Sequence, residues 1–191
     1  MPPATPLIVI GAGGHARVVS DIVRLMGQHA IVGFLDDVNP ERHGSLFCGA
    51  TILGGVERLT GLAGAGVRHA CVAVGDCVAR LRLAGLAAGA GFELPVLIHP
   101  SAVRAADAAV GSGTVLVAGS VVNPGARVGA NVIINTGASV DHDCTIEDGV
   151  HIAVGARLAG HVSVGRGTWI GGFVVAVIGG LQFMYTMYTT A

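Results

Sequence analysis

A hydrophobic residue recurs every six positions through the second half of the chain. The recurring positions are all aliphatic: Val110, Leu116, Val122, Val128, Ile134, Val140, Ile146, Ile152, Leu158, Val164 and Ile170. A second set, four residues after each of these and beginning at Thr114 and Ser120, is small or β-branched throughout. A period of six matches neither a helix nor an ordinary strand. It is typical of a parallel β-helix in which each hexad forms a short strand and a corner.

The hexads predict which side chains point inward. The aliphatic residue fills the interior, the small residue lets the corner close, and three hexads form a coil that stacks on the next at roughly 4.8 Å. Glycine follows the aliphatic residue at Gly111, Gly129 and Gly165, with Glu147 in the remaining slot of this series. We expect these glycines to supply turns that need a positive φ. Arg104 occupies an aliphatic slot, so the first coil is expected to be irregular.

The first half of the chain alternates strands with helices. The pattern predicts strands at 6–10, 30–35, 69–74 and 95–98, and helices at 16–26 and 77–90. A glycine loop separates the first strand from the first helix, and two acids end the second strand, as in a Rossmann-like βαβ unit. The predicted fold is α/β plus β. A small Rossmann-like domain (1–97) is followed by a β-helix (98–172) and an atypical tail (173–191).

Composition narrows the classes of function. The formal net charge is −1 and basic residues are scattered, so we do not expect nucleic acid as a partner. No apolar stretch reaches the ~20 residues that span a bilayer. The N-terminus lacks the features of a signal peptide, so we expect no membrane span and a cytoplasmic location. The four cysteines have no metal-type or disulfide-type spacing, and no metal is expected.

The glycine loop is a candidate phosphate site. Gly11, Gly13 and Gly14 open a helix, where free N–H groups and the helix dipole favour an anion. The motif is not a full G-x-G-x-x-G, and a simple tight turn explains it equally well. His15 either caps the helix or approaches a ligand. Asp36 or Asp37 stands where such folds bind a ribose or a base, the alternative being a solvated loop acid.

Two histidines of the solenoid lie outside the inward slots. His142 takes the third position of its hexad, in Asp141-His142-Asp143, and His151 takes the sixth position of the next. An exposed histidine beside an acid can act as a general base, because the carboxylate fixes the tautomer and stabilises the imidazolium. The alternative for His142 is a solvated turn residue. His161, on the following coil, is expected to be structural or to contact a ligand.

These motifs together resemble the bacterial sugar O-/N-acetyltransferases of the NeuD type, the sialic acid O-acetyltransferase family, and are similar to the UDP-4-amino-sugar N-acetyltransferases. The resemblance rests on segments 8–16, 33–37, 98–102 and 135–144 together with His151, and it covers roughly residues 6–170. It implies a left-handed β-helix and acetyl-CoA as co-substrate. The implied reaction is direct acetyl transfer to the amino group of a nucleotide-linked amino sugar, in the biosynthesis of surface glycans, without a covalent enzyme intermediate.

The resemblance also implies roles for individual residues. His142 matches the catalytic base and Asp143 the acid that orients it. His151 matches the histidine that contacts the thioester carbonyl, and Gly160 belongs to the same coenzyme-binding set. Nucleotide-sugar binding maps to Gly11, Gly13, Gly14 and His15 on the phosphate side and to Asp36 and Asp37 on the base or ribose side. The pantetheine arm is expected between adjacent prisms, so a homotrimer with active sites between subunits is implied.

The chain departs from this family pattern after Gly172, where the hexads stop and the terminal residues contain no basic side chain. We interpret this tail as a truncated or frameshifted end, or as an unusual capping strand, with altered coenzyme contacts. Two alternatives to N-acetylation stay open. One is a sugar O-acetyltransferase of the same fold, and the other is a defective homologue that binds nucleotide sugar without transferring acetyl. A nicotinamide-dependent oxidoreductase is disfavoured, because the solenoid offers no dehydrogenase site.

Overall fold

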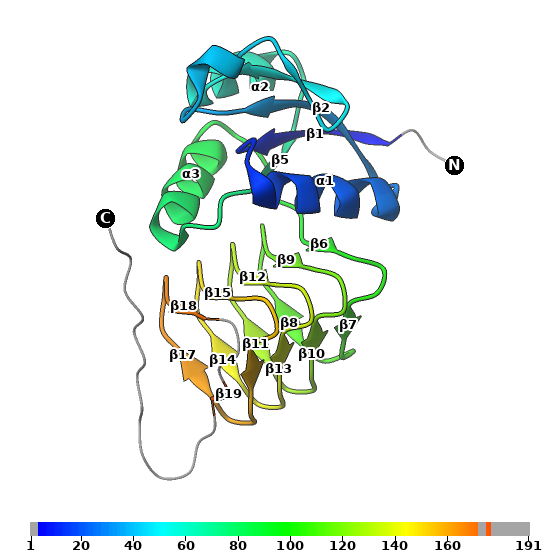
Figure 1. The fold of residues 1–191 in the computed structure, drawn as a ribbon, viewed down its shortest axis with the longest axis vertical. Helices are drawn as coiled ribbons and strands as arrows, with labels where there is room; N and C mark the ends of the chain where they lie inside the picture. Colours follow the sequence, from blue (N-terminus) through cyan, green and yellow to red (C-terminus); the bar gives the residue numbers. More distant parts are fainter. Residues whose placement is uncertain (1–3, 172–174, 177–191) are drawn as a thin grey trace. The chain divides into compact units, whose positions relative to one another are not determined.

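The computed structural model describes residues 4–171 and the backbone of residues 175–176. It divides into two compact units, Met1–Leu97 and Ile98–Ala191 (Figure 1). Within the described residues, no helix is long and apolar enough to span a lipid bilayer. The atypical tail predicted at 173–191 lies outside the described residues, except for the short strand β19, Val175–Ala176.

The first unit is built on a five-stranded sheet with the order β3-β4-β2-β1-β5. Its strands are β1 (Thr5–Ile10), β2 (His29–Leu35), β3 (Leu46–Phe47), β4 (Ala50–Gly54) and β5 (His69–Val72). All pairs are parallel except that of β3 with β4. The order β4-β2-β1-β5 is that of half a Rossmann fold, in which ligands bind beyond the carboxyl ends of the strands, where the order reverses. Here the reversal lies between β1 and β5.

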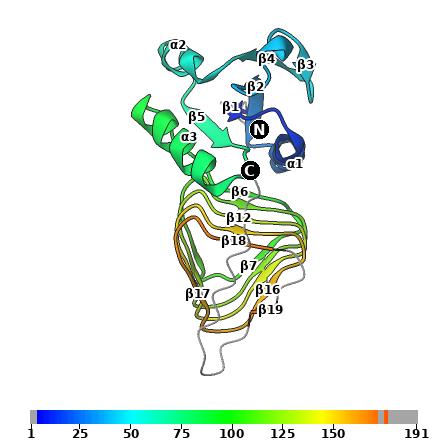
Figure 2. The same cartoon turned by 60° about the vertical axis from the view of Figure 1, so that its left-hand side comes forward.

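Helices cover both faces of this sheet. They are α1 (Gly14–Met26), α2 (Leu59–Gly64) and α3 (Cys77–Gly89), with short 3-10 turns at Pro40–Arg42 and Val56–Arg58. Figure 2 shows α1 and α3 on opposite sides of β1 and β5. Side chains alternate along β1, so that Ile8 and Ile10 join the cluster packed with residues of α2 and α3. The strands predicted at 6–10, 30–35 and 69–74 and both predicted helices are confirmed, whereas the hairpin β3–β4 was not foreseen.

The second unit is a three-sided prism of two-residue strands. The strands are β6 (Leu97–Ile98), β7 (Val103–Arg104), β8 (Ala109–Val110), β9 (Val115–Leu116), β10 (Val121–Val122), β11 (Arg127–Val128), β12 (Ile133–Ile134), β13 (Ser139–Val140), β14 (Thr145–Ile146), β15 (His151–Ile152), β16 (Arg157–Leu158), β17 (Ser163–Val164), β18 (Trp169–Ile170) and β19. They form three parallel sheets, β19-β16-β13-β10-β7, β17-β14-β11-β8 and β18-β15-β12-β9-β6. Each strand therefore pairs with the strand one coil later, as Val122 does with Val140.

The prism interior matches the predicted hexads. The second residue of each strand from β9 to β17 is buried, and Val110 and Ile170 pack against the same core at its ends. The small residues four positions later line the corners, where Ala126, Val132 and Ala138 are completely buried. Burial of an aliphatic side chain contributes roughly 1.5–3 kcal/mol, so the repeated burial is a major stabilising contribution to the prism. Arg104 is exposed at the first coil, as its polar character requires.

The predicted role of the glycines after the aliphatic residue was wrong. Gly111, Gly129 and Gly165 are absent from the residues with positive φ, which instead fall two positions later in the hexad. That slot holds Gly113, Gly119, Gly125, Gly137, Gly149, Gly155 and Gly167, and also Asn131, Asp143 and His161. Gly111 is needed for a different reason. A Cβ atom there would lie 2.6 Å from the carbonyl carbon of Gly129 on the next coil.

The strand predicted at 95–98 does not belong to the first sheet. It is β6, which begins at Leu97 and pairs with β9 in one wall of the prism. The reason is the hexad register, because Ile98 stands two hexads before Val110 and packs against the prism core. The first coil of the solenoid therefore begins at this strand.

We expect the substitution Gly111→Ala to destabilise the prism by about 1–3 kcal/mol, the usual cost of forcing extra atoms into a packed interior. Gly165→Ala is the matched control. Gly165 has the same hexad position, and no described atom lies within 4 Å of a Cβ atom built on it. Thermal unfolding followed by circular dichroism compares the two. Equal melting temperatures would show that close stacking of the coils does not require glycine at position 111.

Candidate functional site

One corner of the prism carries the side chains with acid–base chemistry. Gly125, Asp143 and His161 occupy the same corner slot on three successive coils, and all have a positive φ, of 73°, 57° and 63°. Residues other than glycine adopt this conformation rarely, and such residues cluster at functional sites because the conformation costs energy. Asp143 and His161 thus share a left-handed conformation that glycine adopts most readily and that Asp, Asn and His adopt more often than other residues.

His142 and Asp143 form a hydrogen-bonded pair at this corner. The Nδ1 atom of His142 lies 2.9 Å from Oδ2 of Asp143, and both side chains are about half exposed. Asp141 holds the preceding turn, because its Oδ1 accepts hydrogen bonds from the His142 backbone N–H and from Asn123 Nδ2. With Nδ1–H donating to Asp143, the other ring nitrogen, Nε2, is left as the proton acceptor. The structure thus brings together the two residues that were predicted as base and orienting acid.

The electrostatics of the pair favour a charged imidazole. The hydrogen bond to Asp143 raises the pKa of His142 above its ordinary value, and the negative charges of Asp141 and Asp143 add to this. The same hydrogen bond lowers the pKa of Asp143. A carboxylate that stays ionised and stabilises the imidazolium is the arrangement expected for a base that must take up a proton.

Gly160 provides the space in which the imidazole of His142 lies. A Cβ atom at Gly160 would be 2.5 Å from both Cε1 and Nε2 of His142. Gly160 was predicted to contact the coenzyme, which stays a prediction. The structure adds that the residue must be glycine for the His142 ring to keep its position.

His151, the predicted contact of the thioester, is half-buried on β15. Its Nε2 lies 3.0 Å from Nδ2 of Asn135, and its ring lies 6.3 Å from that of Trp169 on the next coil. Since an amide nitrogen can only donate, Nε2 of His151 accepts and the ring proton resides on Nδ1. His151 is therefore a hydrogen-bond donor through Nδ1. Asn135 was not assigned a role from the sequence.

In the first unit, the glycine loop lies between β1 and α1. Gly11 has a φ of 110°, and a Cβ atom there would contact the Ala73 carbonyl oxygen at 2.8 Å. Gly13 precedes α1 without any side-chain cap, and no described atom lies within 4 Å of a Cβ built at Gly13 or Gly14. Gly13 and Gly14 are exposed and the N-terminus of α1 has no side-chain cap, as an anion site at this end of the helix requires. His15 is half-buried in the first turn of the helix.

Two arginines adjoin this loop and were not foreseen. The guanidinium groups of Arg17 and Arg42 lie 4.9 Å and 5.3 Å from the centre of the Phe47 ring. Nη1 of Arg42 also donates to the carbonyl oxygen of Ala12 within the loop, at 3.0 Å. A cation in the first turn of a helix opposes the helix dipole, and an anion bound at the loop would offset this repulsion for Arg17. Sequence reasoning missed this group because Phe47 lies on β3, a strand it did not predict.

The two acids after β2 shape their own loop. The buried carboxylate of Asp36 accepts hydrogen bonds from Val38 N at 3.0 Å and Asn39 Nδ2 at 3.1 Å, and lies 3.5 Å from Arg42 Nη1. Asp37 is exposed and accepts from Val56 N at 2.8 Å. Their direct contact with a base or ribose stays a prediction.

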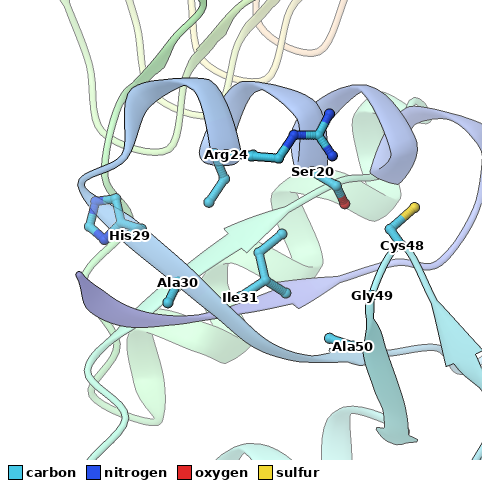
Figure 3. Close-up of a pocket in the computed structure, with 9 residues that line it drawn as sticks. Ser20, Arg24, His29, Ala30, Ile31, Cys48, Gly49 and Ala50 are labelled. Atoms are coloured by element: carbon cyan, nitrogen blue, oxygen red, sulfur yellow. The ribbon is translucent and has the colours of Figure 1, made fainter. Parts of the chain in front are cut away.

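A separate pocket lies between α1, β2 and the turn that joins β3 to β4 (Figure 3). Its lining residues include Ser20, Arg24, His29 and Cys48. None of the residues predicted to bind the nucleotide sugar is among them, so this pocket is distinct from the glycine-loop site.

Comparison with known proteins identifies the family. The model of the PglD N-terminal domain family matches residues 6–85. The acetyltransferase domain of PglB from Neisseria gonorrhoeae FA1090, whose structure is also known in complex with acetyl coenzyme A, is 38% identical, with a TM-score of 0.83 over 89% of this chain and 81% of that one. PerB from Caulobacter crescentus, solved with CoA and GDP-perosamine, is 35% identical, with a TM-score of 0.81 over 86% of this chain and 76% of that one.

This chain belongs to the NeuD-type family of hexapeptide-repeat sugar acetyltransferases. The predicted fold, a Rossmann-like domain followed by a left-handed β-helix, is thereby confirmed. WeeI from Acinetobacter baumannii AYE shares the fold at 19% identity, with a TM-score of 0.70 over 90% of this chain and 88% of that one. A search of curated proteins gives no match.

We expect Asp143→Asn to lower the pKa of His142, because the substitution removes the hydrogen-bonding carboxylate that raises it. Asp141→Asn is the comparison variant, and it should lower the pKa less, since its carboxylate acts on the ring through space. The titration of the His142 ring protons by NMR measures both. An unchanged pKa in Asp143→Asn would mean that the 2.9 Å contact is not a hydrogen bond in solution.

Proposed function

We propose that this protein transfers an acetyl group from acetyl-CoA to the amino group of a nucleotide-linked amino sugar. The observation that carries the proposal is the His142–Asp143 pair, held at an exposed corner with Nε2 as proton acceptor. The known structures of PglB with acetyl coenzyme A and of PerB with CoA and GDP-perosamine support the choice of both substrates.

His142 acts as the general base. Its Nε2 takes a proton from the sugar amine as the nitrogen attacks the thioester carbonyl carbon, while Asp143 stabilises the imidazolium that forms. The C–S bond then breaks, the amide carbonyl reforms, and the proton passes from His142 to the leaving thiolate of coenzyme A. General base catalysis of this kind contributes typically 10²–10⁴-fold to a rate. The reaction needs no covalent intermediate on the enzyme, since both substrates are held together.

His151 contributes a hydrogen bond to the acetyl group. The family resemblance assigns His151 to the thioester carbonyl oxygen, and Asn135 Nδ2 fixes the ring by its contact with Nε2 at 3.0 Å. A donor directed at this oxygen stabilises the negative charge that develops there during attack. Gly160 has no side chain and so leaves the space that the His142 ring occupies.

The first unit binds the nucleotide part of the acceptor. The open N-terminus of α1 and the arginines at positions 17 and 42 form a positive site suited to a diphosphate. His15 flanks this phosphate site, and the loop carrying Asp36 and Asp37 is placed at the end of β2 for the ribose or base. This positive site on the first unit favours a nucleotide-activated sugar as the acceptor, because a free sugar carries no negative charge to pair with Arg17.

Several finer predictions rest on the family resemblance. They are the choice of amine over hydroxyl as acceptor, a place in surface-glycan synthesis, a cytoplasmic location and a homotrimer with shared sites. Sedimentation equilibrium of the intact protein tests the last of these. A monomer at the concentrations used for activity assays would contradict the shared-site homotrimer.

We expect His142→Ala to lower kcat for acetyl transfer by ~10²-fold or more, the scale of losing a general base. Release of coenzyme A thiol, measured with acetyl-CoA and a panel of nucleotide-linked amino sugars, gives the rate. Equal rates for wild type and variant would exclude His142 as the base. If the wild type binds a nucleotide sugar in calorimetry but shows no turnover, the chain is the defective homologue considered above.

We expect Arg17→Gln and Arg42→Gln each to weaken the binding of a nucleoside diphosphate sugar by at least about 10-fold, because a charge-assisted contact contributes about 1.5–3 kcal/mol and each 1.4 kcal/mol is tenfold in affinity. Arg24→Gln is the matched control. Arg24 lies in the last turn of the same helix and pairs with Asp21. Isothermal calorimetry with the nucleotide sugar compares the three. Equal losses in all three variants would mean that general charge, and not a site at the glycine loop, governs affinity.

A further inference from the structure

Three potential metal ligands converge at the corner of the prism. They come from His142, Asp143 and His161, each of which offers one ligand atom, and these three atoms all lie within 4.8 Å of one another. Oδ2 of Asp143 is 2.9 Å from the His142 nitrogen and 3.8 Å from the His161 nitrogen. The two imidazole rings meet edge to face, with centroids 5.0 Å apart. Within the described residues, no other group of three such side chains meets these conditions.

The spacing of these atoms suits a tetrahedral zinc ion. Zinc–nitrogen and zinc–oxygen bonds of about 2.0–2.2 Å place neighbouring ligand atoms of a tetrahedral site roughly 3.3 Å apart. The distances of 2.9 Å and 3.8 Å lie on either side of this value. Small rotations of the exposed side chains are enough to bring both distances to roughly 3.3 Å. Two imidazoles and one carboxylate are a common ligand set for zinc, with a water molecule as the fourth ligand.

The backbone keeps the ligands together without a metal. The N–H group of His161 donates to the carbonyl oxygen of His142 at 2.9 Å, and the N–H group of Asp143 donates to that of Pro124 at 3.1 Å. Asp143 and His161 also share the same positive-φ slot, one coil apart. The side chains of His142, Asp143 and His161 are 52%, 53% and 69% exposed, so an ion can reach the site from solvent.

We propose that His142, Asp143 and His161 form a binding site for Zn²⁺, and that the ion inhibits the enzyme reversibly. The ion is an inhibitor and not a cofactor. Binding takes the electron pair of His142 Nδ1, so the single proton of the neutral ring resides on Nε2. That nitrogen is the one that would accept the proton of the substrate, and it can no longer do so. The metal also occupies the Asp143 oxygen that otherwise stabilises the imidazolium.

His161 is the ligand to which the proposed reaction assigns no proton transfer, so its substitution tests metal binding while the His142–Asp143 pair stays in place. His161→Asn removes one of three ligands, and asparagine is well suited to the positive φ of this slot. His69→Gln is the matched control. His69 lies 3.5 Å from Glu93 and 5.3 Å, between ring centroids, from His29, so it belongs to a second histidine–carboxylate group among the described residues.

Binding is measured by titrating the intact, chelator-treated protein with ZnCl₂ in a calorimeter. We expect one site per chain in the wild type and in His69→Gln, and at least 10-fold weaker binding in His161→Asn. Mg²⁺ should not bind at this site, since it prefers oxygen ligands. Equal zinc affinity in wild type and His161→Asn would overturn the proposal. This arm does not depend on the proposed acetyl transfer.

The inhibitory effect rests on the proposed function and is tested separately by thiol release. Zinc should inhibit the wild type and His69→Gln, and a chelator should restore both. His161→Asn, with its inhibition expressed relative to its own zinc-free rate, should need at least 10-fold more zinc. Equal inhibition of wild type and His161→Asn would overturn the inhibitory role. If the wild type shows no turnover at all, the proposed function fails, while the calorimetric result still decides whether the metal site exists.

Discussion

The structure depends most on the hydrogen-bonded register between successive coils of the prism. Each two-residue strand pairs in parallel with the strand one coil later, so that Val122 stands beside Val140 and Val140 beside Leu158. Buried aliphatic side chains make this register obligatory, because a slip of one residue would expose every one of them. The same register aligns every other hexad position. A side chain at a corner is therefore always stacked on the equivalent corner of the neighbouring coils.

The candidate catalytic site follows from this stacking. His142 and Asp143 lie on one coil, while Gly160 and His161 lie at the same corner of the next, where they leave room for the His142 ring and meet its edge. Most positions of the positive-φ slot are glycine, which adopts this conformation without strain. Asp143 and His161 are exceptions at this corner. The ladder of backbone hydrogen bonds on either side holds both residues in this conformation, next to the His142 ring.

The sequence predicted the fold class and much of the site, for a physical reason. Periodic burial reports which side chains point inward, so it also showed that His142 and its neighbouring acid project outward. The period says nothing of backbone torsion, which is why Gly111 was assigned a turn that Gly113 makes. Contacts between segments far apart in the sequence could not be predicted from the period either. Arg42 reaches Ala12 across thirty residues, and the convergence of His161 on Asp143 depends on side-chain directions that spacing alone does not define.

The central claim is that His142 is the base for acetyl transfer and that its protonation state controls the rate. The most direct test measures the pH dependence of kcat/KM for the wild type and the NMR titration of His142 in the same buffer. A catalytic base must be neutral to act, so the rate should rise with pH along a limb whose midpoint coincides with the His142 pKa. That midpoint should lie above the ordinary histidine value, because the hydrogen bond to Asp143 raises this pKa. A rate that stays constant while His142 passes from charged to neutral would contradict the claim.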